Sequence, residues 1–152
     1  ITFDSQYPDN SFGMGYCAYA AHDSLTASRY LAVALAADPS DFNGHALQAK
    51  IRDRQGRIKD ARKESESCIR LEPWCGTAYT RYGSALQRWG EPQDAIRQLT
   101  IGERNAITDA ASVKRMLRQL LAAGGGSERI LRAGAASGPA AHSREQVQEG
   151  SV

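Results

Sequence analysis

The fold of this chain is decided by a stretch that reads GTAYTRYGSALQRWGEPQDAIRQLTIG, residues 76–102. Its Gly83 lies 34 residues after Ala49, which lies 34 residues after Gly15 (83 − 49 = 49 − 15 = 34). The same interval relates four more columns of the sequence: Ala27/Ala61/Ala95, Ala34/Cys68/Gly102, Pro39/Pro73 and Gly56/Gly90. A period of about 34 residues is the signature of stacked helix–turn–helix units. The sequence therefore predicts an all-α chain made of repeated helix pairs.

Small side chains in these columns predict close contact between helices. A Gly or Ala lets the backbone of a neighbouring helix approach, so that ridges of side chains pack into grooves at a short interaxial distance. The column of Gly15 would mark the first helix of each unit, and the columns of Ala27 and Ala34 would mark the second. Between the two helices, Gly56 and Gly90 would supply the left-handed backbone that ends a helix.

The pattern predicts seven helices. They are expected at about residues 11–21, 24–37, 42–54, 58–71, 76–89, 92–104 and 110–122. The seventh would cover the open end of the stack, which otherwise leaves an apolar face in water. Its apolar stripe consists of Val113, Met116, Leu117, Leu120 and Leu121. Three consecutive glycines, residues 124–126, are expected to end this helix.

On this pattern the chain divides into three parts. Residues 1–8 form a lead-in, residues 9–123 a helical repeat domain, and residues 124–152 a tail rich in Gly, Ala and Ser. The domain holds units at 8–41, 42–75 and 76–109 and a capping helix at 110–122. Because the tail has almost no large apolar residues to offset its ordering entropy, we expect it to be mobile. The alternative is a segment that orders on a partner.

These units resemble the tetratricopeptide repeat (TPR) family over roughly residues 8–107. The matching positions are Gly15, Ala27, Leu31, Ala34 and Pro39, then Ala49, Gly56, Ala61, Cys68, Leu71 and Pro73, then Tyr79, Gly83, Gly90, Ala95, Leu99 and Gly102. The sequence departs from the family where His45, Gln48 and Arg52 replace larger apolar residues, and where Ile107 replaces a closing proline. The resemblance implies a right-handed superhelical array of antiparallel helix pairs, an α-solenoid whose first helices line an inner groove.

Composition and charge bound the class of protein. The chain has 152 residues, of which 41% are hydrophobic and 24% charged, close to the averages of globular domains. A net charge of +2 is too small for a general attraction to nucleic acid or anionic lipid. No apolar run approaches the roughly 18 residues that a transmembrane helix needs. We therefore expect a globular protein without a transmembrane segment.

Residues that could carry chemistry are scattered. Cys17, Cys68 and Cys75 form no Cys-x-x-Cys pair, and the histidines show no ligand spacing, so no metal and no cofactor is expected. The cysteine usage favours a reducing compartment and hence a cytoplasmic location, with the periplasm as the alternative. Asp60 and Glu64 stand four residues apart on one helix, which a solvated surface explains better than acid–base catalysis. No enzyme is expected.

The resemblance also implies which residues would meet a partner. Phe12, Tyr16 and Tyr19 form one aromatic stripe at spacings of 4 and 3. The other candidates, on the first helices of later units and on the seventh helix, are Asn43, Lys50, Arg54, Arg88, Lys114 and Arg118. A groove with an aromatic end and a basic end would take a peptide with an apolar anchor and acidic residues. In the alternative interpretation, the aromatics pack against residues 1–8 and the basic residues are a solvated face.

The leading hypothesis is a protein–protein interaction module, a scaffold or adaptor subunit within a larger assembly. A second hypothesis is a bacterial secretion chaperone of the helical-repeat class. A third is an RNA-binding helical repeat, which reads one base per unit, but the small net charge argues against a nucleic-acid partner. The modules that grip the C-terminal carboxylate of chaperones use Lys, Asn and Arg at positions where this chain has Phe12, Tyr16, Thr80 and Ser84. That subtype is therefore not expected.

Overall fold

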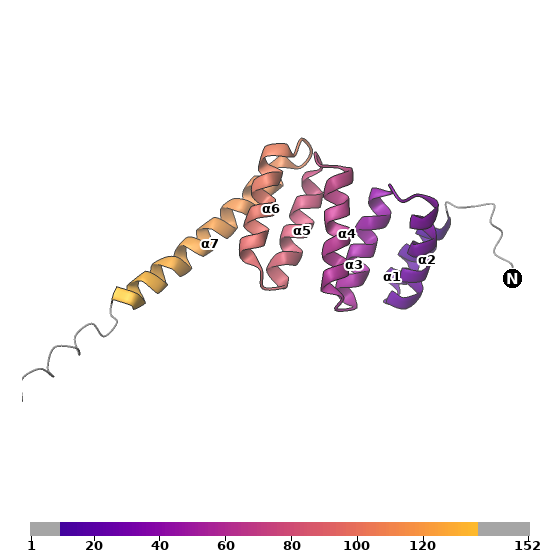
Figure 1. Ribbon diagram of the computed structural model, residues 1–152, viewed down its shortest axis with the longest axis horizontal. Coiled ribbons are helices and arrows are strands. Elements are labelled where there is room, and N and C mark those ends of the chain that lie inside the picture. Colours follow the sequence, from indigo (N-terminus) through magenta and orange to yellow (C-terminus); the bar gives the residue numbers. More distant parts are fainter. Residues whose placement is uncertain (1–9, 137–152) are drawn as a thin grey trace, which may run out of the picture. The chain divides into compact units, whose positions relative to one another are not determined.

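The computed structural model describes residues 10–136, and the side chains of residues 10–124. This part of the chain folds into seven helices without a strand between them (Figure 1). The helices are α1 (Asn10–Ala20), α2 (Ser24–Ala37), α3 (Phe42–Arg54), α4 (Ile58–Leu71), α5 (Gly76–Arg88), α6 (Pro92–Asn105) and α7 (Ala110–Ala136). The predicted all-α fold is confirmed, and the first six helices lie where the sequence pattern placed them.

Short polar residues and glycines set the helix ends. Asp23 Oδ1 accepts a hydrogen bond from the backbone N–H of Thr26 at 3.1 Å, which caps the amino end of α2. Asp41 caps α3 in the same way. Gly56 and Gly90 have φ angles of 72° and 78°, in the left-handed region that the turns were predicted to need.

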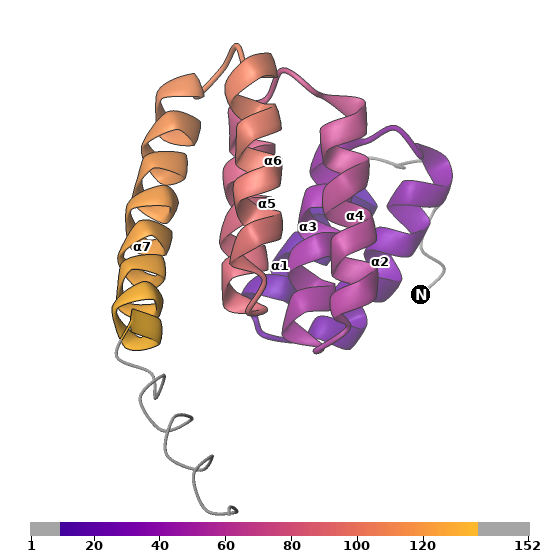
Figure 2. The same cartoon turned by 60° about the vertical axis from the view of Figure 1, so that its left-hand side comes forward.

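The helices form three antiparallel pairs, α1–α2, α3–α4 and α5–α6 (Figures 1 and 2). Packing of α2 on α3 and of α4 on α5 joins each pair to the next. All three pairs belong to the first of two compact units, which ends at Leu117. The candidate site therefore lies within one stack of helices.

The small residues of the repeat lie at the helix contacts. Ala27, Ala61 and Ala95 are 0%, 1% and 0% exposed. A Cβ atom placed on Gly15 would lie 3.1 Å from Cγ of Leu31, and one placed on Gly83 would lie 3.2 Å from Cγ of Leu99. The prediction that small side chains return where paired helices approach each other is confirmed.

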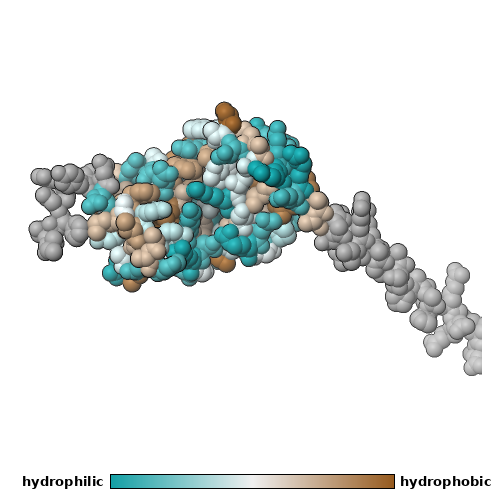
Figure 3. Space-filling model, turned by 180° about the vertical axis from the view of Figure 1, so that it is seen from behind, coloured by the Kyte–Doolittle hydropathy of each residue, from teal (hydrophilic) through white to brown (hydrophobic). Residues whose placement is uncertain are grey.

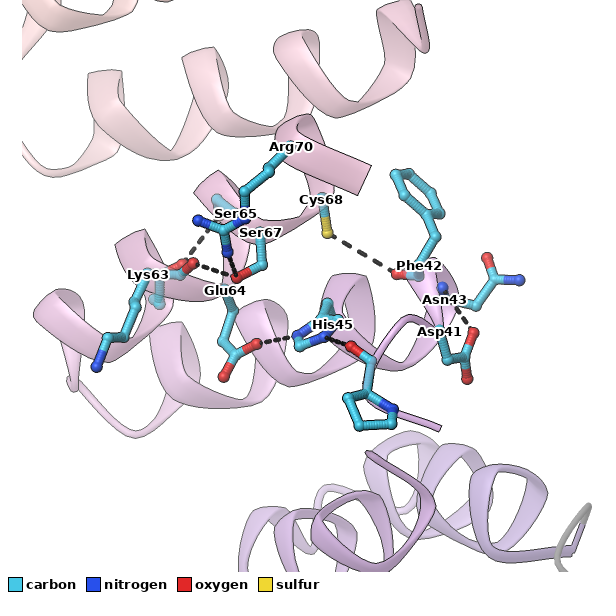
Figure 4. Close-up of polar contacts among 12 residues, drawn as sticks. Asp41, Phe42, Asn43, His45, Lys63, Glu64, Ser65, Ser67, Cys68 and Arg70 are labelled. Atoms are coloured by element: carbon cyan, nitrogen blue, oxygen red, sulfur yellow. Dashed lines mark hydrogen bonds and ion pairs between the residues drawn. The ribbon is translucent and has the colours of Figure 1, made fainter. Parts of the chain in front are cut away.

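The polar residues that interrupt the apolar pattern of α3 differ in whether their side chains are hydrogen-bonded. His45 is half-buried, with Nδ1 2.5 Å from Oε2 of Glu64 and Nε2 2.8 Å from the carbonyl oxygen of Pro39 (Figure 4). Gln48 is 4% exposed, and its Oε1 has no hydrogen-bond partner among the described residues. The assignment of Glu64 to a solvated face was wrong, because its half-buried carboxylate binds a side chain of the neighbouring helix.

The second compact unit begins at Arg118, within α7. The prediction that glycines 124–126 end this helix near Ala122 was wrong, because α7 continues to Ala136. Glycine inside a helix costs only about 1 kcal/mol relative to alanine, so flanking helix formers carry the helix through. Of the predicted apolar stripe, Val113, Leu117 and Leu120 are buried, whereas Leu121 is 52% exposed. The predicted lead-in at 1–8 and the tail beyond residue 136 lie outside the described residues.

None of the helices within 10–136 is both long enough and apolar enough to cross a bilayer. No three His, Cys, Asp or Glu side chains in this range are placed to hold a metal ion.

Candidate functional site

A pocket of about 260 Å³ lies between α3 and α5, with α4 beneath it. Small residues make the room: Ala46 and Ala49 on α3 and Ala78 and Ala85 on α5 line it without filling it. Its polar lining consists of Lys50, Asp53, Ser65, Thr80, Arg81, Ser84 and Arg88. The first helices of units two and three thus present three cations and one carboxylate to one hollow.

The basic residues at the pocket repel one another. Burial lowers the pKa of Lys50, and the positive charges of Arg81 and Arg54 lower it further. Within the described part of the chain, neither Lys50 nor Arg81 forms an ion pair. An anion in the pocket would relieve this repulsion, since an opposite charge within about 4–6 Å favours the protonated amine.

Asp53 is the acidic residue of the pocket, and two neighbours already bind it. Its Oδ2 accepts a hydrogen bond from Nη2 of Arg88 at 2.7 Å, and its Oδ1 accepts one from Nε1 of Trp89 at 2.7 Å. The Arg88 guanidinium is therefore partly neutralised inside the protein. Lys50 and Arg81 are left as the cations best able to take an anion from outside.

Arg54 lies on the aromatic ring of Tyr19. Its guanidinium carbon is 3.8 Å from the ring centroid, and its Nη1 donates to the Tyr19 carbonyl oxygen at 2.9 Å. Such stacking is worth about 0.5–2 kcal/mol, depending on solvation. The aromatic and basic parts of the predicted groove are therefore in contact at this point, where α1 meets α3.

The other predicted residues lie in different places. Phe12 is half-buried and packs against the core cluster of Leu31 and its neighbours, as Tyr19 does. Tyr16 is 57% exposed. Asn43 is exposed in the first turn of α3, where its backbone N–H bonds to Asp41. Lys114 is exposed on α7 in the first unit and is not part of the pocket lining, and Arg118 belongs to the second unit. Among the predicted residues, Lys50 and Arg88 line the pocket.

Sequence reasoning missed Arg81 and Trp89. Arg81 stands three residues before Ser84 and seven before Arg88, so helical spacing alone would have placed it on the same face of α5. Trp89 carried no such signal, because it follows the last residue of α5 and its role depends on Asp53, 36 residues earlier.

Cys68 forms part of the pocket lining from α4. Its Sγ donates a weak hydrogen bond to the Phe42 carbonyl oxygen, 3.8 Å away (Figure 4). Burial raises the pKa of this thiol to about 12, and the negative charge of Glu64 adds to the rise. A thiol that stays protonated near neutral pH is a poor nucleophile, so Cys68 contributes packing.

Comparison with known structures identifies the fold. The TPR2B domain of yeast Sti1, solved in a complex with pHsp70, aligns with a TM-score of 0.65 at 20% identity, over 76% of this chain and 94% of that one. This chain has the TPR fold. The Sgt2 TPR domain of Aspergillus fumigatus aligns at TM-score 0.66 and 21% identity, over 82% of this chain and 83% of that one.

A bacterial protein also has a similar structure. The Yersinia enterocolitica translocator chaperone SycD aligns at TM-score 0.66 and 12% identity, over 81% of this chain and 89% of that one. No protein-family model and no curated protein sequence matches this chain. The likeness is therefore one of fold.

Proposed function

We propose that this protein is a protein-interaction module whose α3–α5 pocket binds an acidic side chain of a partner peptide. The observation that carries the proposal is the convergence of Lys50 and Arg81 on one pocket without an ion-pair partner within the described residues. Like charges held together cost free energy, and such arrangements concentrate at functional sites. Ser84 adds a hydroxyl group to the same wall, whereas the Thr80 hydroxyl beside it donates to the Thr77 carbonyl oxygen within α5.

Aromatic surface near the pocket supports an apolar anchor beside the acidic residue. Trp89 lines the pocket, and Tyr19 lies under Arg54, whose charge acts on Lys50. Rigid aromatic side chains bury contact area at low entropic cost and often dominate peptide binding. A peptide running from the pocket toward Tyr19 would meet cations first and aromatic surface second.

Structures of the same fold are consistent with peptide binding. The first TPR of Spaghetti (RPAP3), which aligns at TM-score 0.64 and 17% identity, was solved with the HSP90 peptide SRMEEVD. YrrB, at TM-score 0.61 and 16% identity, is described as having an unusual peptide-binding site. The similarity to SycD is no stronger than that to Sgt2, so it does not favour a secretion-chaperone role over other binding roles.

Selection from a random peptide display library tests the proposal. We expect the full chain to enrich peptides that combine Asp or Glu with a large apolar residue. The double variant Lys50→Glu with Arg54→Glu should lose these peptides while keeping its circular dichroism spectrum. The matched control, Lys59→Glu with Arg70→Glu, changes the same number of charges on exposed positions of α4 and should bind normally. If both double variants bound the selected peptides equally well, the proposal that the α3–α5 pocket binds them would be wrong.

A further inference from the structure

The α3–α5 pocket lies at repeat positions that form a hydrophobic core one unit earlier. Where the first helix pair meets α3, the core cluster includes five large apolar or aromatic side chains: Phe12, Tyr19, Leu31, Leu47 and Ile51. The residues 34 positions later, in the same order, are Ala46, Asp53, Ser65, Arg81 and Ala85. All five of these line the pocket. The second junction of the stack therefore has a hollow where the first junction is filled.

This difference lowers the packing energy of the second junction. Leu31 and Ile51 are 0% exposed, and their counterparts Ser65 and Ala85 cannot replace the apolar contacts that such side chains make. The surface follows the same trend, since the end of the unit formed by α1 and α2 shows more tan and brown surface in Figure 3 than the opposite end, where teal predominates. A place where the repeat gives up core packing for polar groups is where a functional site is expected.

Two positive charges in the pocket have no partner. Asp53 and Arg88 bind each other, with Oδ2 2.7 Å from Nη2, so their charges cancel. Lys50 and Arg81 form neither an ion pair nor a side-chain hydrogen bond with any residue that the structure describes. Besides burial, the charge of Arg81 lowers the pKa of Lys50 on α3, and it also opposes the rise that burial imposes on the pKa of Cys68 on α4. Arg81 thus acts on both sides of the hollow.

Three unpaired donor groups face this hollow: the Lys50 amine, the Arg81 guanidinium and the Ser84 hydroxyl. A carboxylate offers them two oxygens and one negative charge, which leaves one cation unpaired. A phosphate monoester offers three terminal oxygens and a charge of about −1.5 to −2 near pH 7. The number of oxygens and the charge of a phosphate monoester both match the donors of this pocket.

We propose that the pocket binds a phosphorylated serine or threonine of the partner peptide. This inference rests on the proposed function, because it specifies which acidic side chain the pocket takes. The Arg81 guanidinium binds two phosphate oxygens as a fork, and the Lys50 ammonium binds the third. Ser84 donates its hydroxyl to the same group. The small side chains of Ala46 and Ala49 leave room for the phosphate ester between the two helices.

Fluorescence anisotropy on the full chain tests the inference with four synthetic peptide mixtures. The mixtures share random flanking residues, including large apolar ones, and differ at a fixed centre: phosphoserine, Glu, a Glu-Glu pair or Ser. We expect the phosphoserine mixture to bind about tenfold or more tighter than the Glu and Glu-Glu mixtures, and the Ser mixture not to bind.

The other outcomes separate this inference from the proposed function. Binding of Glu or Glu-Glu as tight as that of phosphoserine would overturn the phosphate inference and leave the acidic-peptide function standing. If none of the mixtures bound, both would be overturned. Inorganic phosphate is a competitor in the same assay. If it displaced the phosphopeptides at their own concentration, the site would belong to free phosphate instead of a peptide.

Variants that restore the residues of the first junction test the pocket itself. Arg81→Leu should reduce the affinity for phosphoserine peptides to that for Glu peptides. Combining Arg81→Leu with Ser65→Leu and Ala85→Ile should fill the hollow, raise the urea midpoint of unfolding and abolish binding. Arg104→Leu is the control, because Arg104 is exposed on α6 outside the pocket lining and should bind like wild type. A phosphoserine preference that survives Arg81→Leu would overturn the inference, whether or not the triple variant folds.

Discussion

At the scale of single residues, Tyr79 and Gly102 show why a small residue is needed at a position where two helices of a pair approach each other. Tyr79 is fully buried, and its hydroxyl donates to the Pro73 carbonyl oxygen at 2.8 Å. A Cβ atom on Gly102 would lie 2.6 Å from Cγ of Tyr79, far inside contact distance. Because the hydroxyl is anchored and the interior is close-packed, the ring has nowhere to move.

Gly102→Ala should therefore destabilise the protein by about 1–3 kcal/mol, in spite of the higher helix propensity of alanine. Urea unfolding followed by circular dichroism measures the change. Gly13→Ala is the control, since a Cβ there meets only Asn10 Oδ1 at 3.9 Å. It should stabilise α1 by about 0.5–1 kcal/mol. Equal effects of the two substitutions would contradict the packing argument.

Cys68 gives a second prediction at this scale. Cys68 is 4% exposed and the pKa of its thiol is raised to about 12, whereas Cys17 is exposed. Iodoacetamide at pH 8 should modify Cys17 in the native protein and reach Cys68 only after unfolding, because the thiolate is the reactive form. Peptide mass spectrometry over a time course measures both rates. Similar rates at the two sites would mean that the pocket floor is open.

At the scale of helices, His45 links α3, on which it lies, to α4 and to the turn between α2 and α3. Its two ring nitrogens contact a carboxylate on α4 and a carbonyl oxygen in the turn between α2 and α3. Both partners accept hydrogen bonds, so both nitrogens donate, which requires the imidazolium form. Burial lowers the pKa of His45, but the hydrogen bonds to Glu64 and Pro39 outweigh it and raise the pKa above its usual value of 6.5.

This raised pKa predicts a pH dependence of stability. A group whose pKa is higher in the folded state stabilises fully below its unfolded pKa, about 6.5, and loses that contribution as pH rises through the folded value. The stability gap between wild type and His45→Gln should therefore be largest near pH 5.5 and shrink toward pH 8.5. Urea unfolding of both proteins across this range measures the gap.

Glu64→Gln is the control for the cause of this effect. It keeps the shape of the side chain but removes the charge, so the pH dependence assigned to His45 should weaken. A gap between wild type and His45→Gln that stays constant with pH would show that His45 contributes packing alone.

At the scale of the whole molecule, a few polar contacts couple the second helix pair to the third. Asp53 of α3 binds Arg88 and Trp89 at the end of α5. Arg62 of α4 pairs with Glu91 and with Asp94, at the start of α6. Of these contacts, those of Asp53 join α3 to the end of α5 beside the pocket. Asp53 also sets the pocket's charge, since it neutralises Arg88 from within.

Asp53→Asn should therefore tighten binding of acidic peptides. The amide oxygen still accepts from Trp89, while the Arg88 charge becomes available to a ligand. Stability should fall by less than about 1 kcal/mol, because Arg88 is largely exposed and exposed ion pairs contribute little. Fluorescence anisotropy with a display-selected acidic peptide, at low and high salt, measures affinity. Weaker binding than wild type would show that Asp53 holds the pocket shape rather than competing with the ligand.

The sequence by itself determined the helix pairs and their contacts. Glycine at 56 and 90 and small residues at 27, 61 and 95 have local or periodic causes: a left-handed turn, or a close approach repeated every 34 residues. The end of α7 could not be predicted in the same way, because glycines lower helix stability without supplying a terminating contact.

The tertiary structure decided the site. Lys50 and Arg88 were foreseeable as groove residues, but their different states were not: Lys50 faces other cations, and Arg88 is already bound to Asp53. Arg54 looked like a free cation and lies on Tyr19 instead. Periodicity determines which residues share a face, because the geometry of a single helix sets that spacing. Which charged residue meets which partner depends on side chains about 35 positions apart in the sequence. Only the packing of one helix pair on the next brings such side chains together.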